Sequence, residues 1–278
     1  MAESRSRSLF SDMVGRPDEA VDLAQAALLI ACEEYADLDI ARYLHRLDDM
    51  GSAARERLSP GAPPEESVAT LNRYLFREQG FRGNTREYHD PRNSYLNEVL
   101  DRRTGIPISL SAVYMEVAHR AGLRVEGVGL PGHFIVKVAG ASGDILIDPF
   151  HQGAILSSED CQKRLDRVYG GRIRMEGAML AACERKEILA RMLRNLKAIY
   201  LKAEDHARAL GIVDLLLRVS PESGEDLRDR GLLYAAMDCY HLAVRDLEAY
   251  LTLVPGTPES GDILDRIVEM RQKAARLN

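Results

Sequence analysis

His133 and Asp148 are the two residues of this sequence best placed to do chemistry together. They belong to two short β-branched segments, residues 133–138 and 144–148, whose apolar–polar alternation predicts an antiparallel hairpin. If residues whose numbers sum to 281 face each other, His133 lies opposite Asp148. Directly opposed Cβ atoms are about 4.5–5.5 Å apart, so we expect an imidazole–carboxylate hydrogen bond. Such a pair can orient a general base, or it can simply close the hairpin.

A catalytic pair also needs a nucleophile at the start of the neighbouring helix, where the helix dipole stabilises an anion. The segment 105–111, which begins that helix, contains no cysteine but has Ser109 and Ser111. A serine hydroxyl is harder to ionise than a thiol and needs a well-placed base and an oxyanion hole. Ser109 is therefore either a nucleophile beside His133 or, as we favour, a hydrogen-bond partner of the helix-start backbone.

Metal and thiol chemistry are weaker alternatives. His151 follows Asp148 by three residues, so these two and His133 form a conceivable His–Asp–His metal site. That spacing is not a strong metal signature, and we predict no metal and no other cofactor. The cysteines lack a CxxC motif and are predicted to be buried or half-buried free thiols in a reducing compartment. They are Cys32, Cys161, Cys183 and Cys239.

The elements that must position these residues indicate an α+β domain. Apolar spacing over residues 108–120 predicts a central helix that ends at Gly122. Three short β-branched segments follow and predict an antiparallel sheet: residues 125–130, 133–138 and 144–148. Residues 17–79 are predicted to be helices packed on this core. Residues 80–94 are predicted to be an ordered loop, whose Tyr88 could cover the cleft.

The last third of the chain contains an internal repeat. A set of positions from Leu193 to Pro221 is matched 34 residues later, from Leu227 to Pro255. Small residues in this set let the two helices of each unit approach closely, and the period and chemistry are those of tetratricopeptide repeats. Because solenoids usually need about three units, residues 260–277 are predicted to be a capping helix. Residues 186–278 would thus form two repeats plus this cap.

Several motifs together carry a family resemblance. They are residues 90–100, 102–110, 132–134 and 147–150. With the repeats, they resemble the SirB-type bacterial family, whose members join a transglutaminase-like core to tetratricopeptide repeats. The resemblance covers nearly the whole chain and implies a papain- or transglutaminase-like core over residues 80–180. His133 and Asp148 match the second and third members of that fold's Cys–His–Asp triad.

The first member of the triad does not match. The position of the cysteine falls at or beside Pro107, which is no nucleophile but suits the first turn of a helix. Ser109 lies two residues further on and is rotated by about 200° around the helix. We therefore expect a non-catalytic or degenerate member that binds a protein or peptide partner through its repeats. The alternative is a hydrolase or acyl-transferase that uses Ser109, His133 and Asp148 on peptide or amide bonds.

Composition excludes other classes of protein. The chain has 278 residues, 46% of them hydrophobic, and a formal net charge of −6, so a disordered chain and a non-specific nucleic-acid binder are both disfavoured. No apolar run is long enough to span a bilayer. Residues 1–16 lack the apolar core of a signal peptide and are predicted to be a disordered lead, which suggests a cytoplasmic protein. One group of basic residues is interpreted as a solvated helix face: Arg185, Lys186, Arg191, Arg194 and Lys197.

Overall fold

The structure, a computed structural model, describes residues 5–277 and divides into two compact units. The larger unit, residues 16–192, has the α+β architecture that the sequence predicts, and the described residues before Arg16 and after Met192 form the smaller, helical unit. No helix between residues 5 and 277 combines the length and the apolar composition that crossing a bilayer requires.

Helices lead into the sheet of the larger unit, as predicted for residues 17–79. They are η1 (Asp18–Ala20), α2 (Leu23–Ala31), α3 (Ile40–Arg57), α4 (Pro64–Asn72), the π-helical η2 (Arg73–Glu78), η3 (Pro91–Asn93) and α5 (Leu96–Arg102). Aspartate side chains begin three of them: Asp22 accepts the backbone N–H of Gln25, Asp39 that of Arg42 and Asp90 that of Arg92. Such N-caps satisfy backbone donors that have no partner within the helix.

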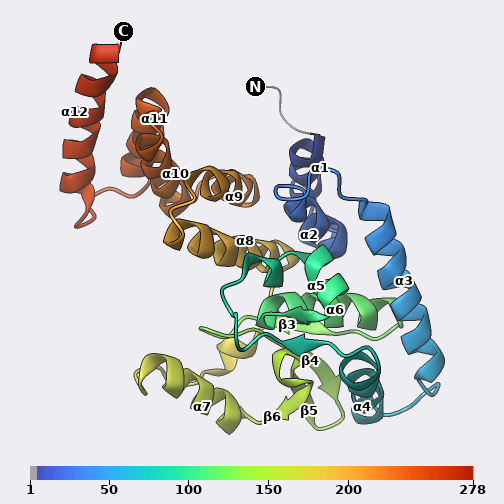
Figure 1. The fold of residues 1–278 in the computed structure, drawn as a ribbon. Helices are drawn as coiled ribbons and strands as arrows, with labels where there is room; N and C mark the ends of the chain where they lie inside the picture. The colour runs from blue at the N-terminus through green and yellow to red at the C-terminus, as the bar shows by residue number, and fades with distance from the viewer. Residues whose placement is uncertain (1–4, 278) are drawn as a thin grey trace. The chain divides into compact units, whose positions relative to one another are not determined.

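The central element is α6 (Pro107–Arg120), which contacts α2, α3 and α5 as well as the sheet (Figure 1). Its first residue is Pro107, whose missing N–H is no loss in the first turn of a helix. Gly122 follows with a φ of +88°, the left-handed conformation that ends a helix readily at glycine. The helix therefore has the bounds that the sequence predicts to within one residue.

The sheet is antiparallel, and its strands pair in chain order. They are β3 (Glu126–Val128), β4 (Ile135–Gly140), β5 (Gly143–Asp148) and β6 (Ala154–Leu156). The sequence does not predict β6, which is only three residues long and mostly exposed, so it has no clear alternation. The elements β1 (Arg82–Gly83) and β2 (Thr104–Gly105) pair in parallel elsewhere, and η4 (Pro149–His151), α7 (Ser158–Tyr169) and η5 (Gly177–Leu180) complete the unit.

The predicted register of the β4–β5 hairpin is wrong by two residues. Val136 pairs with Ile147 and Lys137 with Leu146, so paired numbers sum to 283 rather than 281. The hairpin turns at residues 141–142 between two paired glycines, which places the two-residue loop one position later than predicted. Because side chains alternate with a period of two, this even shift leaves each of them on its predicted face.

The smaller unit holds the repeats. Its helices are the second half of α8 (Arg185–Lys202), then α9 (His206–Val219), α10 (Gly224–Ala236), α11 (Tyr240–Leu253) and α12 (Ser260–Leu277). Ala209 and Ala243 are 0% exposed, as predicted for the close-packed positions of two helix pairs. A Cβ on Gly231 would lie 2.7 Å from Cγ of Leu247, so α10 and α11 approach closely there. The predicted capping helix is α12, which packs against α11.

The prediction of a disordered lead over residues 1–16 is wrong for α1 (Arg5–Val14); residues 1–4 lie outside the described residues. Phe10, Met13 and Val14 are buried, and α1 packs on α9 within the smaller unit. These residues have the i, i+3, i+4 spacing of an amphipathic helix, which the surrounding serines and arginines obscure in the sequence.

The interpretation of the basic group as a solvated helix face is wrong for Lys197 and Arg191, whereas Arg194 is exposed as predicted. Lys197 is 6% exposed, and its Nζ lies 2.8 Å from carboxylate oxygens of both Asp226 and Asp229. In the larger unit, Nη2 of Arg191 donates to the carbonyl of Leu130 at 2.9 Å. These cations have protein partners and do not form a free basic surface.

Candidate functional site

The carboxylate of Asp148 is the centre of the candidate site. Asp148 is 0% exposed at the end of β5, and its Oδ2 accepts hydrogen bonds from Nε2 of His133 at 2.9 Å and Nδ1 of His151 at 2.8 Å. The same oxygen forms an ion pair with Nη2 of Arg164 at 2.8 Å. Oδ1 of Asp148 accepts the backbone N–H groups of Phe150 at 3.0 Å and His151 at 3.2 Å. Four hydrogen bonds and one ion pair to an arginine therefore converge on one carboxylate.

Local sequence explains two of these contacts. Asp148 caps η4, in which Pro149 occupies the first position, so the Asp-Pro-Phe-His run is a side-chain-to-backbone turn of the kind that aspartate favours. The predicted contact between His133 and Asp148 is present. His133 lies just before β4, and in the observed register it reaches Asp148 diagonally across the end of the hairpin instead of from the directly opposite position.

Asp148 is ionised at neutral pH. Burial alone raises the pKa of this carboxyl, but the hydrogen bond from His133, with Arg164 and His151 beside it, outweighs burial and lowers the pKa to about 2. Nε2 of His133 then carries the proton that it donates to this carboxylate. Within residues 5–277 no other hydrogen bond engages this ring. The hydrogen bond fixes the orientation of the imidazole.

Aromatic rings cover the pair. The ring of Phe150 lies edge-on to His133 at a centroid distance of 6.3 Å, and Tyr88 lies edge-on to Phe150 at 6.0 Å. Tyr88 belongs to the predicted loop over residues 80–94. This loop therefore reaches the candidate site through Phe150, which agrees with the cover that the sequence suggests.

Ser109 has a different environment. It is 0% exposed, and its Oγ donates to the carbonyl of Asn93 at 2.6 Å and accepts the N–H of Ile106 at 3.1 Å. A Cβ on Gly105 would lie 2.6 Å from this Oγ, so the glycine leaves room for the serine. These are the helix-start backbone contacts of the favoured hypothesis, and no hydrogen bond joins Ser109 to His133 or Asp148.

Arg164 is the member of the cluster that the sequence does not predict. It comes from α7, an amphipathic helix in which Arg164 is one of two arginines and has no distinguishing sequence signal of its own. Ser111, the other serine considered, is 0% exposed, and its hydroxyl has no partner among the described residues. The contacts of Arg164 and the burial of Ser111 follow from the three-dimensional fold and have no signal in the sequence.

The positions of His133, Asp148 and His151 can be compared with those that a metal ion requires. One ligand atom each of His133, Asp148 and His151 lie within 4.8 Å of one another, so the set is compact enough to hold an ion. However, the guanidinium of Arg164 already lies 2.8 Å from Oδ2 of Asp148. A fixed positive charge at the same oxygen repels a metal cation, so this site fits a metal poorly.

Thiols do not take the place of the missing nucleophile. All four cysteines are free, and only Cys239 is exposed, contrary to the prediction that they are buried or half-buried. Cys161, on the same helix as Arg164, packs in a hydrophobic cluster with Ile135 and Leu146, and burial raises the pKa of its thiol. It is an inert core residue.

Comparison with known proteins confirms the two predicted parts. Residues 41–194 match the transglutaminase-like superfamily, and residues 196–272 match the tetratricopeptide repeat. The SirB-type designation stays a prediction from the resemblance.

Similar proteins come from several bacteria. A UPF0162 protein of Xylella fastidiosa (strain Temecula1) is 36% identical over 273 residues, which cover 97% of each chain. UPF0162 protein PA3419 of Pseudomonas aeruginosa is 32% identical over 91% of this chain and 93% of its own. UPF0162 protein YchA of Escherichia coli (strain K12) is 31% identical over 88% of this chain and 92% of its own. The chain therefore belongs to the UPF0162 family, with a transglutaminase-like part followed by tetratricopeptide repeats.

Proposed function

We propose that this protein is a non-catalytic, degenerate transglutaminase-like protein that binds a protein or peptide partner through its repeats, as an interaction or regulatory module of the cytoplasm. The observation that carries the proposal is the environment of Ser109. Its hydroxyl is fully buried and hydrogen-bonded to Asn93 and Ile106. A nucleophile needs access to a substrate and a base within hydrogen-bond reach, and Ser109 has neither in this conformation.

The start of α6 offers no replacement. Pro107 stands at or beside the place of the superfamily's cysteine and has no nucleophilic atom. Cys161 is buried in the core with a raised thiol pKa. The imidazole of His133 therefore has no serine or cysteine within hydrogen-bond reach among the described residues.

The surroundings of Asp148 support a structural role for the pair. In a working triad the carboxylate serves mainly to orient one imidazole. Here the carboxylate also binds Arg164 from α7 and His151 from η4. It joins three separate segments of the larger unit, which is what a buried polar packing centre does.

The repeats supply the proposed interaction surface. Tetratricopeptide arrays stack helix pairs into extended surfaces that bind other proteins. In this chain α1 and α12 pack on the two helix pairs at α9 and α11 and so add the area that two repeats alone lack. We propose no cofactor, nucleic acid or membrane as a partner.

A labelling experiment tests the proposal. The full chain and Ser109→Ala are treated with a serine-reactive acyl probe, and the mass of the intact protein is measured. We expect no acylation that depends on Ser109. A Ser109-dependent acyl-enzyme burst with a peptide or amide substrate would instead establish the alternative, a hydrolase or acyl-transferase that uses Ser109, His133 and Asp148.

A further inference from the structure

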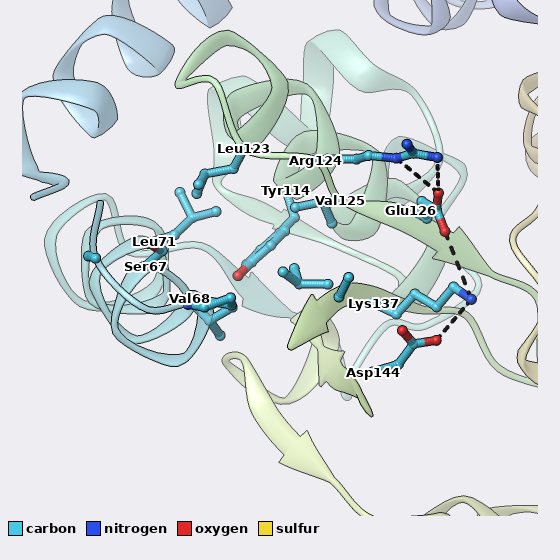
Figure 2. Close-up of a pocket in the computed structure, with 14 residues that line it drawn as sticks. Ser67, Val68, Leu71, Tyr114, Leu123, Arg124, Val125, Glu126, Lys137 and Asp144 are labelled. Carbon is cyan, nitrogen blue, oxygen red and sulfur yellow. Dashed lines mark hydrogen bonds and ion pairs between the residues drawn. The ribbon is translucent and has the colours of Figure 1, made fainter. Parts of the chain in front are cut away.

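A cavity of about 410 Å³ lies in the larger unit between α4, α6 and the strands β3 to β5 (Figure 2). Pockets for small ligands typically measure about 300–1,000 Å³. The cavity shares no residue with the Asp148 cluster. It is therefore a separate candidate site, and it does not depend on the proposed function.

The walls of the cavity are mainly aliphatic. Val68 and Leu71 line it from α4, and Leu123, Val125 and Val138 line it from the sheet side. Figure 2 shows the ring of Tyr114 between Val68 and Leu71 on one side and Val125 on the other. Such walls favour an aliphatic ligand by the hydrophobic effect.

One buried polar atom stands out in this apolar wall. Tyr114, on α6, is 0% exposed, and its hydroxyl has no hydrogen-bond partner among residues 5–277. Phe76 stacks on its ring at a centroid distance of 6.1 Å, which fixes the ring in place. Burial raises the pKa of Tyr114, so the hydroxyl keeps its proton. A buried donor without an acceptor is unfavourable, and a ligand that supplies an acceptor removes that penalty.

The charged residues of the cavity neutralise one another. Nζ of Lys137 lies 3.0 Å from Asp144 and 3.8 Å from Glu126, and Arg124 lies 2.8 Å from Glu126. Figure 2 shows this chain of ion pairs along one side of the cavity. Two cations and two anions leave no net charge to attract an ion.

We propose that this cavity binds a small uncharged molecule, mainly aliphatic, with one hydrogen-bond acceptor such as a ketone oxygen for the hydroxyl of Tyr114. In Figure 2 this hydroxyl points toward Ser67 and Val68 of α4. Because Tyr114 is fully covered, the acceptor reaches the hydroxyl when one of these two side chains turns aside. The carbon chain of the ligand then packs between α4 and the sheet.

The test is a titration of the full chain followed by methyl NMR at Val68, Leu71 and Leu123, with Leu216 of the repeats as the reference. The probes are 2-heptanone, heptanoate and toluene. We expect saturable shifts with 2-heptanone and at least about tenfold weaker binding of heptanoate, because no net charge favours it. Tyr114→Phe should weaken 2-heptanone about fivefold, the worth of one net hydrogen bond, and leave toluene unchanged.

A second variant guards against misfolding of the first. Ala139 lines the cavity but is exposed, so Ala139→Trp fills the cavity without overpacking the core. It should abolish the shifts, whereas Ala141→Trp, on the exposed turn of the same hairpin, should not. The proposal is overturned if no probe shifts these methyl groups, if heptanoate binds as tightly as 2-heptanone, or if Ala139→Trp leaves binding intact.

Discussion

The start of α6 and the end of the β4–β5 hairpin place their polar side chains in opposite ways. At the helix start, Ser109 binds only backbone groups, at Asn93 and Ile106. At the hairpin end, Asp148 binds side chains from three separate segments. The hydrogen bonds of Ser109 satisfy backbone groups at the start of α6. The contacts of Asp148 connect separate segments of the larger unit. The carboxylate at the hairpin end therefore has more side-chain partners than the hydroxyl at the helix start, and this difference predicts unequal losses of stability on mutation.

The largest effect is expected from Asp148→Asn. The amide keeps the shape but removes the charge, and it turns a donor toward groups that are themselves donors, including Arg164. Breaking a buried, multiply bonded ion pair costs about 3–5 kcal/mol, so we expect the free energy of unfolding in urea to fall by about 3 kcal/mol. Asp144→Asn, at an exposed position of the same strand, is the control and should cost less than about 1 kcal/mol. Equal losses of stability at the two positions would contradict the prediction that the buried contacts of Asp148 stabilise the protein more than those of Asp144.

The pH dependence of stability should be the next largest effect. The pKa of Asp148 is lowered from 3.8 to about 2 in the folded protein. A lowered pKa means that its contribution is complete above about pH 4 and is lost as the pH falls from about 4 to 2. The loss is about 2 kcal/mol, since one pKa unit corresponds to about 1.4 kcal/mol.

Other carboxyls also titrate in this range, so the difference between wild type and Asp148→Asn is the quantity to follow. Unfolding is measured in urea at several pH values for both proteins. The difference should shrink by about 2 kcal/mol between pH 4 and pH 2. A difference that stays constant over this range would show that Asp148 has an ordinary pKa.

Sequence predicts those parts of the fold that depend on long periodic patterns. The central helix and the repeat helices have unbroken apolar spacing, and both are found where predicted. Apolar spacing does not predict an element that depends on a tertiary contact, and it does not predict a strand register that depends on the position of a turn. The apolar face of α1 matters only because α9 covers it, and the hairpin register depends on which two residues form the loop.

The candidate site likewise contains one contact that the sequence predicts and others that it does not. The contact of His133 with Asp148 is predictable because the two residues lie at the open end of one hairpin and a local alternation places them on one face. Arg164 is not, because α7 brings it to Asp148 from outside the hairpin. For Ser109 the sequence allows either a nucleophile or a partner of the helix-start backbone. The structure favours the second role because the hydroxyl donates to the carbonyl of Asn93, which is 16 residues away in the sequence.

A substitution in the repeats provides a loss of stability with which the losses at Asp148 and Ser109 can be compared. Ala243 is 0% exposed between two helices, so Ala243→Trp should overpack them and cost about 1–3 kcal/mol, seen as a lower midpoint of thermal unfolding. Leu242→Trp, at a position 38% exposed on the same helix, is the matched control and should change little. A protein partner bound through the repeats should be lost with the first variant and kept with the second. Native thermal stability of Ala243→Trp would show that this position is not close-packed.

Ser109→Ala should have a smaller effect than Asp148→Asn. It leaves the N–H of Ile106 and the carbonyl of Asn93 without their partner in a buried place, at a cost of about 1–2 kcal/mol in urea unfolding. The matched control is Ser111→Ala on the same helix, whose buried hydroxyl has no partner to lose and whose stability should change by less than about 0.5 kcal/mol. Similar results for the two serines would mean that the Ser109 hydroxyl does not hold the helix start.

His133→Ala should have the smallest effect, about 1 kcal/mol. The sequence alone predicts about 1–3 kcal/mol if Asp148 is left buried and unpaired. In the structure Asp148 keeps donors from His151, Arg164 and the backbone, so the loss should lie at the lower end of that range. His133→Gln, whose amide can still donate to Asp148, should recover part of it in the same urea titration. A loss as large as that of Asp148→Asn would reverse the comparison, because the carboxylate would then depend on this one imidazole, as a catalytic pair requires, and not on the whole cluster.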